Sequence, residues 1–257
     1  MGVVISIAIQ KGGSGKTTTS FNLAANLKAK GKKVLLIDLD AQRNLSFASN
    51  CLTEDNTIYD VLTGDISIKK SIRQLEHYDF IPASENLDKA PYVFNEEGNI
   101  YLLKNALSSI KNDYDYIILD NPPSLGIVLI NSLIASNTVI IPMEGSFFSV
   151  QGLTKLYDSI QQAKEYNSNL SILGILLIRY SERNILSRDV KTMLDNFSEQ
   201  MQTRVFKTTI RESIVVKESV AKQMPLIKYS KNSKPCIDYK GFASEVIRLT
   251  REIDTNE

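Results

Sequence analysis

The chain is poor in the residues that build several common kinds of functional site. Its 257 residues include one histidine, two cysteines and no tryptophan. A single histidine, His77, leaves almost no material for a Ser-His-Asp triad or a histidine-rich metal site. Two cysteines cannot form a disulfide framework. The low cysteine count favours a reducing, cytoplasmic compartment.

Long apolar runs and a strong charge imbalance are also missing. No apolar stretch approaches the roughly 18 residues of a membrane helix, and no basic segment precedes the apolar start at Val3 as in a signal peptide. The formal net charge is +1 and 43% of the residues are hydrophobic. This composition argues against disorder and predicts no stable membrane association.

Continuous apolar runs alternate with stretches of helical spacing. The runs are rich in Val and Ile, which is typical of strands covered on both faces of a parallel sheet. They span residues 3–9, 34–37, 116–119, 138–141 and 172–178. Helical spacing follows over residues 17–29, 126–135, 150–164, 186–201 and 242–253. The alternation predicts an α/β fold: a doubly wound, mostly parallel sheet with helices on both faces and ligands at the carboxyl ends of the strands. Residues 52–99 are less regular and predict one strand (79–82) among partly exposed helices and loops.

A glycine-rich loop stands between the first strand and the first helix. It reads QKGGSGKTT over residues 10–18. Glycines let backbone N–H groups turn towards phosphate oxygens, and the helix N-terminus adds a partial positive charge. Lys16 supplies a full charge for the β- and γ-phosphates, and Thr17 supplies a hydroxyl ligand for Mg²⁺. The pattern predicts a nucleoside triphosphate site that consists of Lys11, Gly12, Gly13, Ser14, Gly15, Lys16, Thr17 and Thr18.

Two other predicted strands end in an aspartate. Asp38 follows residues 34–37, and Asp120 follows residues 116–119. An apolar strand followed by Asp fits a Walker B motif, whose carboxylate holds Mg²⁺ or its waters. Alone, each Asp could instead cap a helix. With a phosphate loop in the same sheet, we predict Thr17, Asp38 and Asp120 as the metal residues.

Together these segments resemble the ParA/MinD family of deviant Walker ATPases, and its ParA branch most closely. The resemblance is carried by residues 11–18, 34–44 and 114–131, and further by residues 141–153, 174–184 and 209–229. The common phosphate loop has glycine where this chain has Gln10; Lys11, one residue later, is the mark of the deviant group. The family implies a P-loop NTPase fold, with ATP and Mg²⁺ as cofactors. We expect one domain over residues 1–257, without a helix-turn-helix extension before the loop.

The resemblance also implies roles for individual residues. Lys11, Lys16 and Asp40 are the expected catalytic residues: Lys11 reaches the nucleotide of a partner subunit, and Asp40 positions the attacking water. Gly12 lies where the two subunits come close. Arg211 is expected beside the base of the nucleotide, with DNA contact as an alternative.

The loop after the second strand departs from the family pattern. The family usually has Asp-Pro-Gln-Gly-Asn, whereas residues 40–44 read Asp-Ala-Gln-Arg-Asn. Arg43 in place of glycine puts a bulky cation near the expected dimer face. In some relatives a second DNA-binding basic residue stands at the position of Val215.

The charge distribution shifts towards the C-terminus. Residues 204–240 contain nine Lys and Arg against three Asp and Glu, a local net charge of +6. Nonspecific DNA binding needs a positive surface facing phosphates, although a solvated surface would have the same composition. The predicted DNA-binding residues are Arg183, Arg188, Lys217, Lys222, Lys231 and Lys234.

These features predict an ATP-dependent partition protein. Its ATP-bound sandwich homodimer would bind double-stranded DNA nonspecifically, associate with the nucleoid, and hydrolyse ATP when a ParB-type centromere-binding protein stimulates it. Two alternatives stay open. One is a MinD-like membrane-positioning ATPase, which the acidic tail after Ile253 disfavours; the other is a nucleotide-dependent scaffold with little turnover.

Overall fold

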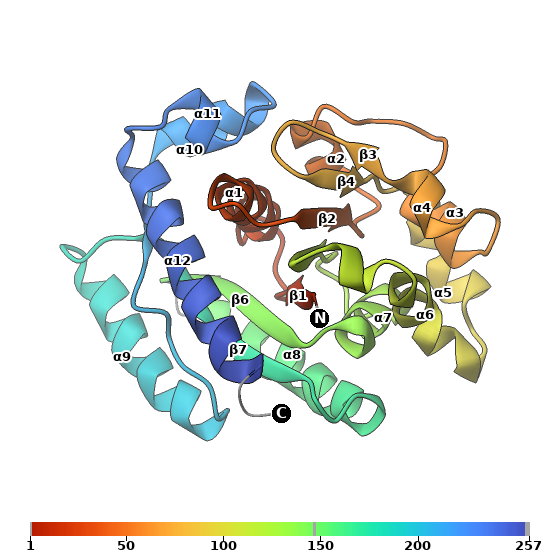
Figure 1. Cartoon of the computed structure of the whole chain (residues 1–257). Helices are drawn as coiled ribbons and strands as arrows, with labels where there is room; N and C mark the ends of the chain where they lie inside the picture. The colour runs from red at the N-terminus through yellow and green to blue at the C-terminus, as the bar shows by residue number, and fades with distance from the viewer. Residues whose placement is uncertain (1, 146–147, 255–257) are drawn as a thin grey trace.

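The centre of the molecule is a mixed β-sheet (Figure 1). The computed structural model describes residues 2–145 and 148–254. Its strands are β1 Val3–Ile7, β2 Val34–Asp38, β3 Arg73–Gln74, β4 Asp79–Ile81, β5 Tyr116–Asp120, β6 Thr138–Glu144, β7 Ser171–Tyr180 and β8 Ile210–Arg211. They are ordered β3-β4-β2-β5-β1-β6-β7-β8, and the β3–β4 pair is antiparallel while the other neighbours are parallel. β1 thus lies where the strand order reverses, which is where such sheets bind ligands.

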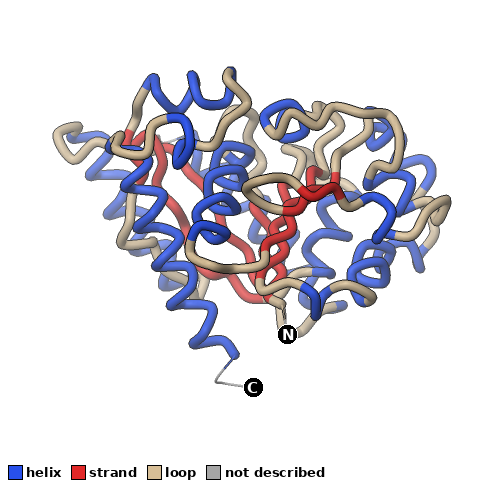
Figure 2. Tube along the Cα trace, turned by 45° about the horizontal axis from the view of Figure 1, so that its top comes forward, coloured by secondary structure: helices blue, strands red, loops and turns tan. Residues whose placement is uncertain are grey.

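Helices cover both faces of this sheet, as Figure 2 shows. The helices are α1 Lys16–Ala29, α2 Asn44–Ala48, α3 Ile58–Leu62, α4 Ile68–Ser71, α5 Ala90–Val93, α6 Leu102–Ser108, α7 Ile127–Ala135, α8 Phe148–Tyr166, α9 Ile185–Gln200, α10 Ile214–Ala221, α11 Leu226–Tyr229 and α12 Lys234–Asp254. Three short 3₁₀ turns, η1 Glu85–Lys89, η2 Glu97–Tyr101 and η3 Lys111–Asp113, join some of them. Among the described residues, no helix combines the length and the apolarity needed to cross a bilayer.

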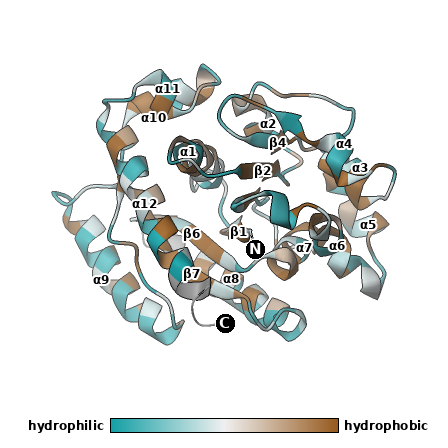
Figure 3. Ribbon diagram, viewed as in Figure 1, coloured by the Kyte–Doolittle hydropathy of each residue, from teal (hydrophilic) through white to brown (hydrophobic). Residues whose placement is uncertain are grey.

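The core has one layer on each side of the sheet. On one side, Phe21 and Leu23 of α1 pack with Phe242 of α12 and the strand residues that face them. On the other side, α7 and α8 cover β6 and β7, with Leu133 and Leu156 fully buried. The strands are mostly hydrophobic in Figure 3, whereas α9 carries many hydrophilic residues. The predicted doubly wound α/β fold is confirmed.

Several predicted boundaries were wrong. The first strand ends at Ile7 rather than at residue 9, because the chain there already turns into the glycine-rich loop. The last helix starts at Lys234, eight residues before the predicted start at residue 242. Pro235 in its first turn is a recognised helix-start signal, since proline needs no N–H partner there. β3, β8, α10 and α11 are too short to give a clear periodic signal. Residues 146–147 of the family segment 141–153, and the end of the acidic tail (255–257), lie outside the described residues.

Gly174 on β7 allows a second segment to approach the strand closely. The backbone of Ile175 bonds to Arg204 and Phe206, and the Phe206 ring packs edge-on against Phe242 at 5.0 Å. A Cβ on Gly174 would lie 2.7 Å from the Phe206 ring and 3.1 Å from the carbonyl oxygen of Arg204. Because Gly174 has no side chain, the segment before β8 can pack directly against β7.

We expect Gly174→Ala to destabilise the protein by about 1–3 kcal/mol, because ring and backbone must both shift. Gly241→Ala is the matched control. Gly241 lies inside α12, and its Cβ would be 3.6 Å from Thr208, an ordinary van der Waals contact. We therefore expect the free energy of unfolding to rise by about 0.5–1 kcal/mol, because alanine is favoured over glycine within a helix. Urea unfolding measures both. Equal effects of the two substitutions would contradict the packing role of Gly174.

Candidate nucleotide site

The glycine-rich loop connects β1 to the start of α1. Gly13 and Gly15 have φ angles of +70° and +74°, in the left-handed region that favours glycine. The Ser14 hydroxyl donates to the carbonyl oxygen of Lys11 over 2.9 Å and closes the turn. A Cβ on Gly15 would also collide with the Ile178 side chain of β7. The loop thus has the shape that a phosphate-binding turn requires.

Lys16 lies beneath this loop and is only 6% exposed. Its Nζ donates to the carbonyl oxygens of Ile9 at 3.3 Å and Lys11 at 3.1 Å. Burial lowers the pKa of Lys16, and the charges of Asp120 and Asp40 oppose this effect. A partly desolvated ammonium group interacts strongly with anionic oxygens because little water screens it.

Two buried carboxylates lie side by side at the carboxyl ends of β2 and β5. Asp38 and Asp120 are register partners, and each is 0% exposed. Burial raises the pKa of Asp38 to about 6. Burial and, next, the charge of Asp38 raise the pKa of Asp120 to about 8. At neutral pH the pair is therefore only partly ionised, and a cation bound beside it would favour the ionised form.

Asp120 keeps one oxygen available for a cation. Its Oδ1 accepts a hydrogen bond from the Ser20 hydroxyl at 2.8 Å, whereas its buried Oδ2 has no hydrogen-bond partner among the described residues. The Thr17 hydroxyl is close enough to help lower the pKa of Asp120. A free carboxylate oxygen beside a hydroxyl matches the oxygen ligands that Mg²⁺ prefers. Asp120 and Thr17 therefore fit the predicted metal.

Asp38 differs from Asp120 because protein donors occupy both of its oxygens. Its Oδ2 accepts from the backbone N–H and the hydroxyl of Ser46 at 2.8 and 2.7 Å, and its Oδ1 accepts from the N–H of Asp40 at 3.1 Å. These bonds fix the loop that follows β2. A metal role for Asp38 stays a prediction, and its contacts favour a role in positioning that loop.

Asp40 lies at the mouth of a cavity that the phosphate loop borders. This cavity of about 570 Å³, the loop cavity, is lined by residues 12–18 together with Asp40, Gln42, Asn44, Phe47, Pro123, Arg179, Lys217, Val220 and Ala221. Burial raises the pKa of Asp40, and the backbone N–H of Gln42 donates to its Oδ1 at 3.0 Å. The predicted water-positioning residue and residues 12–18 of the predicted phosphate-binding loop thus share one cavity, which Lys11 does not line.

Arg43, which stands where the family usually has glycine, adopts a left-handed backbone conformation. Its φ is +54°, and it precedes the first residue of α2. Its guanidinium group is ion-paired with Glu54 and, at 3.0 Å, with Glu85, and only 16% of the side chain is exposed. The Arg43 guanidinium is therefore held by carboxylates of its own chain.

Lys11 and Arg179 share one carboxylate. Lys11 Nζ lies 3.6 Å from Glu144 Oε2, and Arg179 is ion-paired with Glu144 Oε1. Glu144 ends β6 and Arg179 lies near the end of β7, with a left-handed φ of +49°. The lysine expected to reach a partner subunit is thus paired within its own chain.

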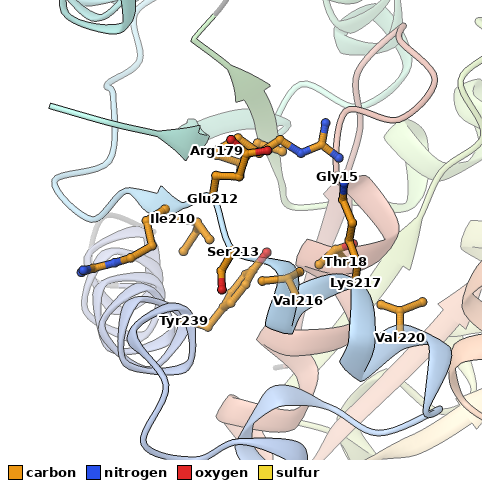
Figure 4. Close-up of a pocket in the computed structure, with 12 residues that line it drawn as sticks. Gly15, Thr18, Arg179, Ile210, Glu212, Ser213, Val216, Lys217, Val220 and Tyr239 are labelled. Atoms are coloured by element: carbon orange, nitrogen blue, oxygen red, sulfur yellow. The ribbon is translucent and has the colours of Figure 1, made fainter. Parts of the chain in front are cut away.

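A second cavity lies beside the loop cavity. This apolar cavity of about 250 Å³ is drawn in Figure 4 and is lined by Gly15, Thr18, Ile178, Arg179, Ile210, Arg211, Glu212, Ser213, Val216, Lys217, Val220 and Tyr239. Arg211, which the resemblance places beside the nucleotide base, lines this cavity, and its contact with a base stays a prediction. Its guanidinium, however, is bound to Asp238 by Nε at 2.7 Å and by a terminal nitrogen at 2.8 Å. The apolar side chains of this wall suit a base better than the paired cation does.

The six residues predicted to bind DNA are all exposed. Arg183 precedes α9, and Arg188 lies in its first turn. The other four belong to α10, the segment that follows it and the start of α12, which lie on the same half of the molecule in Figure 1. Lys217 also lines both cavities. Val215 is half-buried against the core and has no charge to offer a DNA phosphate.

Sequence reasoning missed Glu144, Arg179, Ser20 and Ser46. Glu144 and Arg179 could have been found, because each lies within three residues after a predicted parallel strand, where polar residues face the ligand edge. Ser20 and Ser46 gave no such signal, since serines within helices are common and their partners lie far away in the sequence.

Comparisons with known proteins agree with this geometry. A family model described as an AAA domain matches residues 2–172. The sporulation initiation inhibitor protein Soj of Bacillus subtilis is 36% identical over 96% of this chain and 98% of its own length. The chromosome-partitioning ATPase Soj of Treponema pallidum is 34% identical, over 96% and 98%. This chain belongs to the ParA family of P-loop ATPases.

Solved structures extend the ParA-family comparison. An ATP-analogue and magnesium complex described as cobyrinic acid a,c-diamide synthase from Mycobacterium smegmatis has a TM-score of 0.85 and 29% identity, covering 96% of this chain and 95% of that one. The cell division ATPase MinD of Pyrococcus furiosus has a TM-score of 0.78 and 26% identity, covering 97% and 100%. The predicted cofactors, ATP and Mg²⁺, agree with the ligands of the first structure.

The acidic pair predicts a pH dependence of stability. A folded-state pKa above the unfolded value of 3.8 means that the protonated acid stabilises the fold, and this contribution is lost as pH rises through the folded pKa. Through Asp120, the free energy of unfolding should therefore fall from about pH 4 and level off above about pH 8, and the measurement window is the last part of this fall, between about pH 7 and 8.5. His77, whose pKa is lowered from 6.5, acts below this window with the opposite sign.

Asp120→Asn should flatten this dependence, as measured by urea unfolding in EDTA. Adding Mg²⁺ and ATP should stabilise the wild type more at pH 8.5 than at pH 7. The same slope in wild type and variant would show that Asp120 does not titrate in this range.

Proposed function

We propose that this chain is a DNA-partitioning ATPase that binds ATP with Mg²⁺, closes into a sandwich dimer, binds DNA without sequence preference, and hydrolyses ATP on contact with a ParB-type centromere-binding protein. The observation that carries the proposal is the loop cavity, which brings Lys16 and the rest of residues 12–18 to one site with Asp40. Membership of the ParA family supports the ATPase part of it.

The proposed reaction is phosphoryl transfer to water, which depends on positioning and charge compensation. Lys16 would neutralise the β- and γ-phosphates, and its burial strengthens that interaction. Thr17 and Asp120 would hold Mg²⁺, which supplies further positive charge to the phosphates. Asp40 would orient the attacking water, and the raised pKa from its partial burial makes it a better proton acceptor than an exposed aspartate.

The proposed dimer depends on Lys11. Two nucleotides facing each other place many negative charges together, and a cation from each side offsets the repulsion. Lys11 would leave Glu144 and reach the nucleotide of the partner subunit. At 33% exposure its side chain is accessible for that movement.

The proposed DNA surface consists of the exposed basic residues around α9, α10 and the start of α12. The local net charge of +6 in residues 204–240 supports it. Because phosphate contacts dominate such binding, we expect no base preference and a steep fall of affinity with salt.

Asp40→Ala should bind ATP and dimerise but lose hydrolysis by about 100-fold, because no group then orients the water. Lys16→Ala is the paired control and should not bind ATP at all. Equilibrium binding of a fluorescent ATP analogue, together with single-turnover phosphate release with DNA and the partner, separates the two steps. Normal turnover in Asp40→Ala would remove Asp40 from its role. A wild type that binds ATP and releases no phosphate would indicate a scaffold instead.

Arg183→Ala should weaken DNA binding with ATP and reduce the slope of log affinity against log salt by about 1. Dimerisation should be unchanged. Lys69→Ala, an exposed lysine on α4, is the control and should leave DNA binding as in the wild type. Gel retardation across a salt series measures the effect. Undiminished DNA binding by Arg183→Ala would place the DNA surface elsewhere.

A further inference from the structure

The loop cavity and the apolar cavity share part of their walls. Gly15, Thr18, Arg179, Lys217 and Val220 line both. Beyond these shared residues, the loop cavity is lined by Lys16 and Asp40, and the apolar cavity is lined by aliphatic side chains and the ring of Tyr239. One end of the combined space therefore suits phosphates, and the other suits a planar apolar group.

Two cations stand at the junction between the cavities. In Figure 4 the side chains of Arg179 and Lys217 point to the same corner of the apolar cavity, beside Gly15. They come from β7 and α10, on opposite sides of that corner. Glu212, which also lines the apolar cavity, is the acidic residue of this wall.

We propose that Arg179 and Lys217 bind the nucleotide of their own protomer at the phosphate nearest the ribose. The proposal rests on the nucleotide site proposed above and adds two residues to it. A nucleotide with its base in the apolar cavity and its γ-phosphate near Lys16 must pass its α-phosphate through the junction. Charge-assisted hydrogen bonds from a guanidinium and an ammonium suit that phosphate. Since ADP and ATP both carry it, the two residues would bind both ligands alike.

Glu144 positions Arg179 for this contact. An arginine with φ of +49° adopts a backbone conformation that costs free energy, so other contacts must hold it. The ion pair with Glu144 is such a contact, and the 44% exposure of the Arg179 side chain leaves its guanidinium accessible. Glu144 also contacts Lys11, and when Lys11 moves to the partner subunit's nucleotide the carboxylate would stay with Arg179.

The test is the affinity for fluorescent ADP and ATP analogues at protein concentrations where the chain is monomeric. Arg179→Met should weaken both ligands about 10-fold, the loss expected when a charged hydrogen bond to phosphate is removed. Lys217→Met should weaken both in the same direction. Lys28→Met, an exposed lysine at the far end of α1, is the matched control and should bind as the wild type does.

A second arm separates nucleotide contact from a purely structural ion pair. In the Glu144→Gln background the pair with Arg179 is already lost. If Arg179 contacts the nucleotide, Arg179→Met should still cost about 10-fold there. Disappearance of the loss in this background, or affinities within two-fold of the wild type in the single variant, would overturn the proposal. Thermal unfolding without nucleotide checks that each variant is folded.

The outcomes also separate this proposal from the function proposed above. A wild type that binds neither nucleotide would remove the nucleotide site itself and this inference with it. A wild type whose binding is abolished by Lys16→Ala but unchanged by Arg179→Met and Lys217→Met would remove only the inference. A loss for ATP and none for ADP would contradict the assignment to the α-phosphate.

Discussion

The burial of an ammonium group beside two carboxylates is the constraint on which the rest of the site depends. Lys16, Asp38 and Asp120 lie within the protein at the point where the strand order reverses. Their charges cannot be hydrated there, so each must be compensated by neighbours or remain partly neutral. Hydroxyls and backbone groups compensate part of this charge. The remainder, above all the Asp120 oxygen that has no hydrogen-bond partner among the described residues, would be compensated by a cation in the proposed nucleotide complex.

Segments from both ends of the chain line the two adjoining cavities. The phosphate loop follows β1, whereas the apolar cavity is built largely from β8, α10 and α12, some 200 residues later. Packing of α1 against α12 holds the two regions together. A nucleotide that occupies both cavities would therefore contact segments from both ends of the chain. This arrangement offers a direct route by which the ligand could influence the exposed basic helices.

Much of the fold and part of the site could be predicted from local sequence. The strand–loop–helix at residues 3–29 and the acids after β2 and β5 are contiguous patterns, so their placement followed from known geometry. Partners distant in the sequence could not be foreseen. Glu144 pairs with Lys11 and Arg179, 133 and 35 residues away, and nothing in the local pattern indicates that choice. The same holds for Asp38, whose oxygens bind Ser46 rather than remaining open. Lys217 shows the limit of reasoning from charge alone, because its position at the cavities depends on how α10 packs.

Arg43 shows how one backbone conformation can be maintained by two different means. A glycine tolerates φ near +54° because it lacks a Cβ, and solution conditions do not alter that property. Here Arg43, a residue with a Cβ, adopts this conformation, and its guanidinium forms ion pairs with two exposed carboxylates, Glu54 and Glu85. Counter-ions weaken contacts of this kind. The shape of the turn after Asp40, and with it the alignment of that carboxylate, thereby becomes sensitive to ionic strength, because two surface ion pairs help to hold the turn.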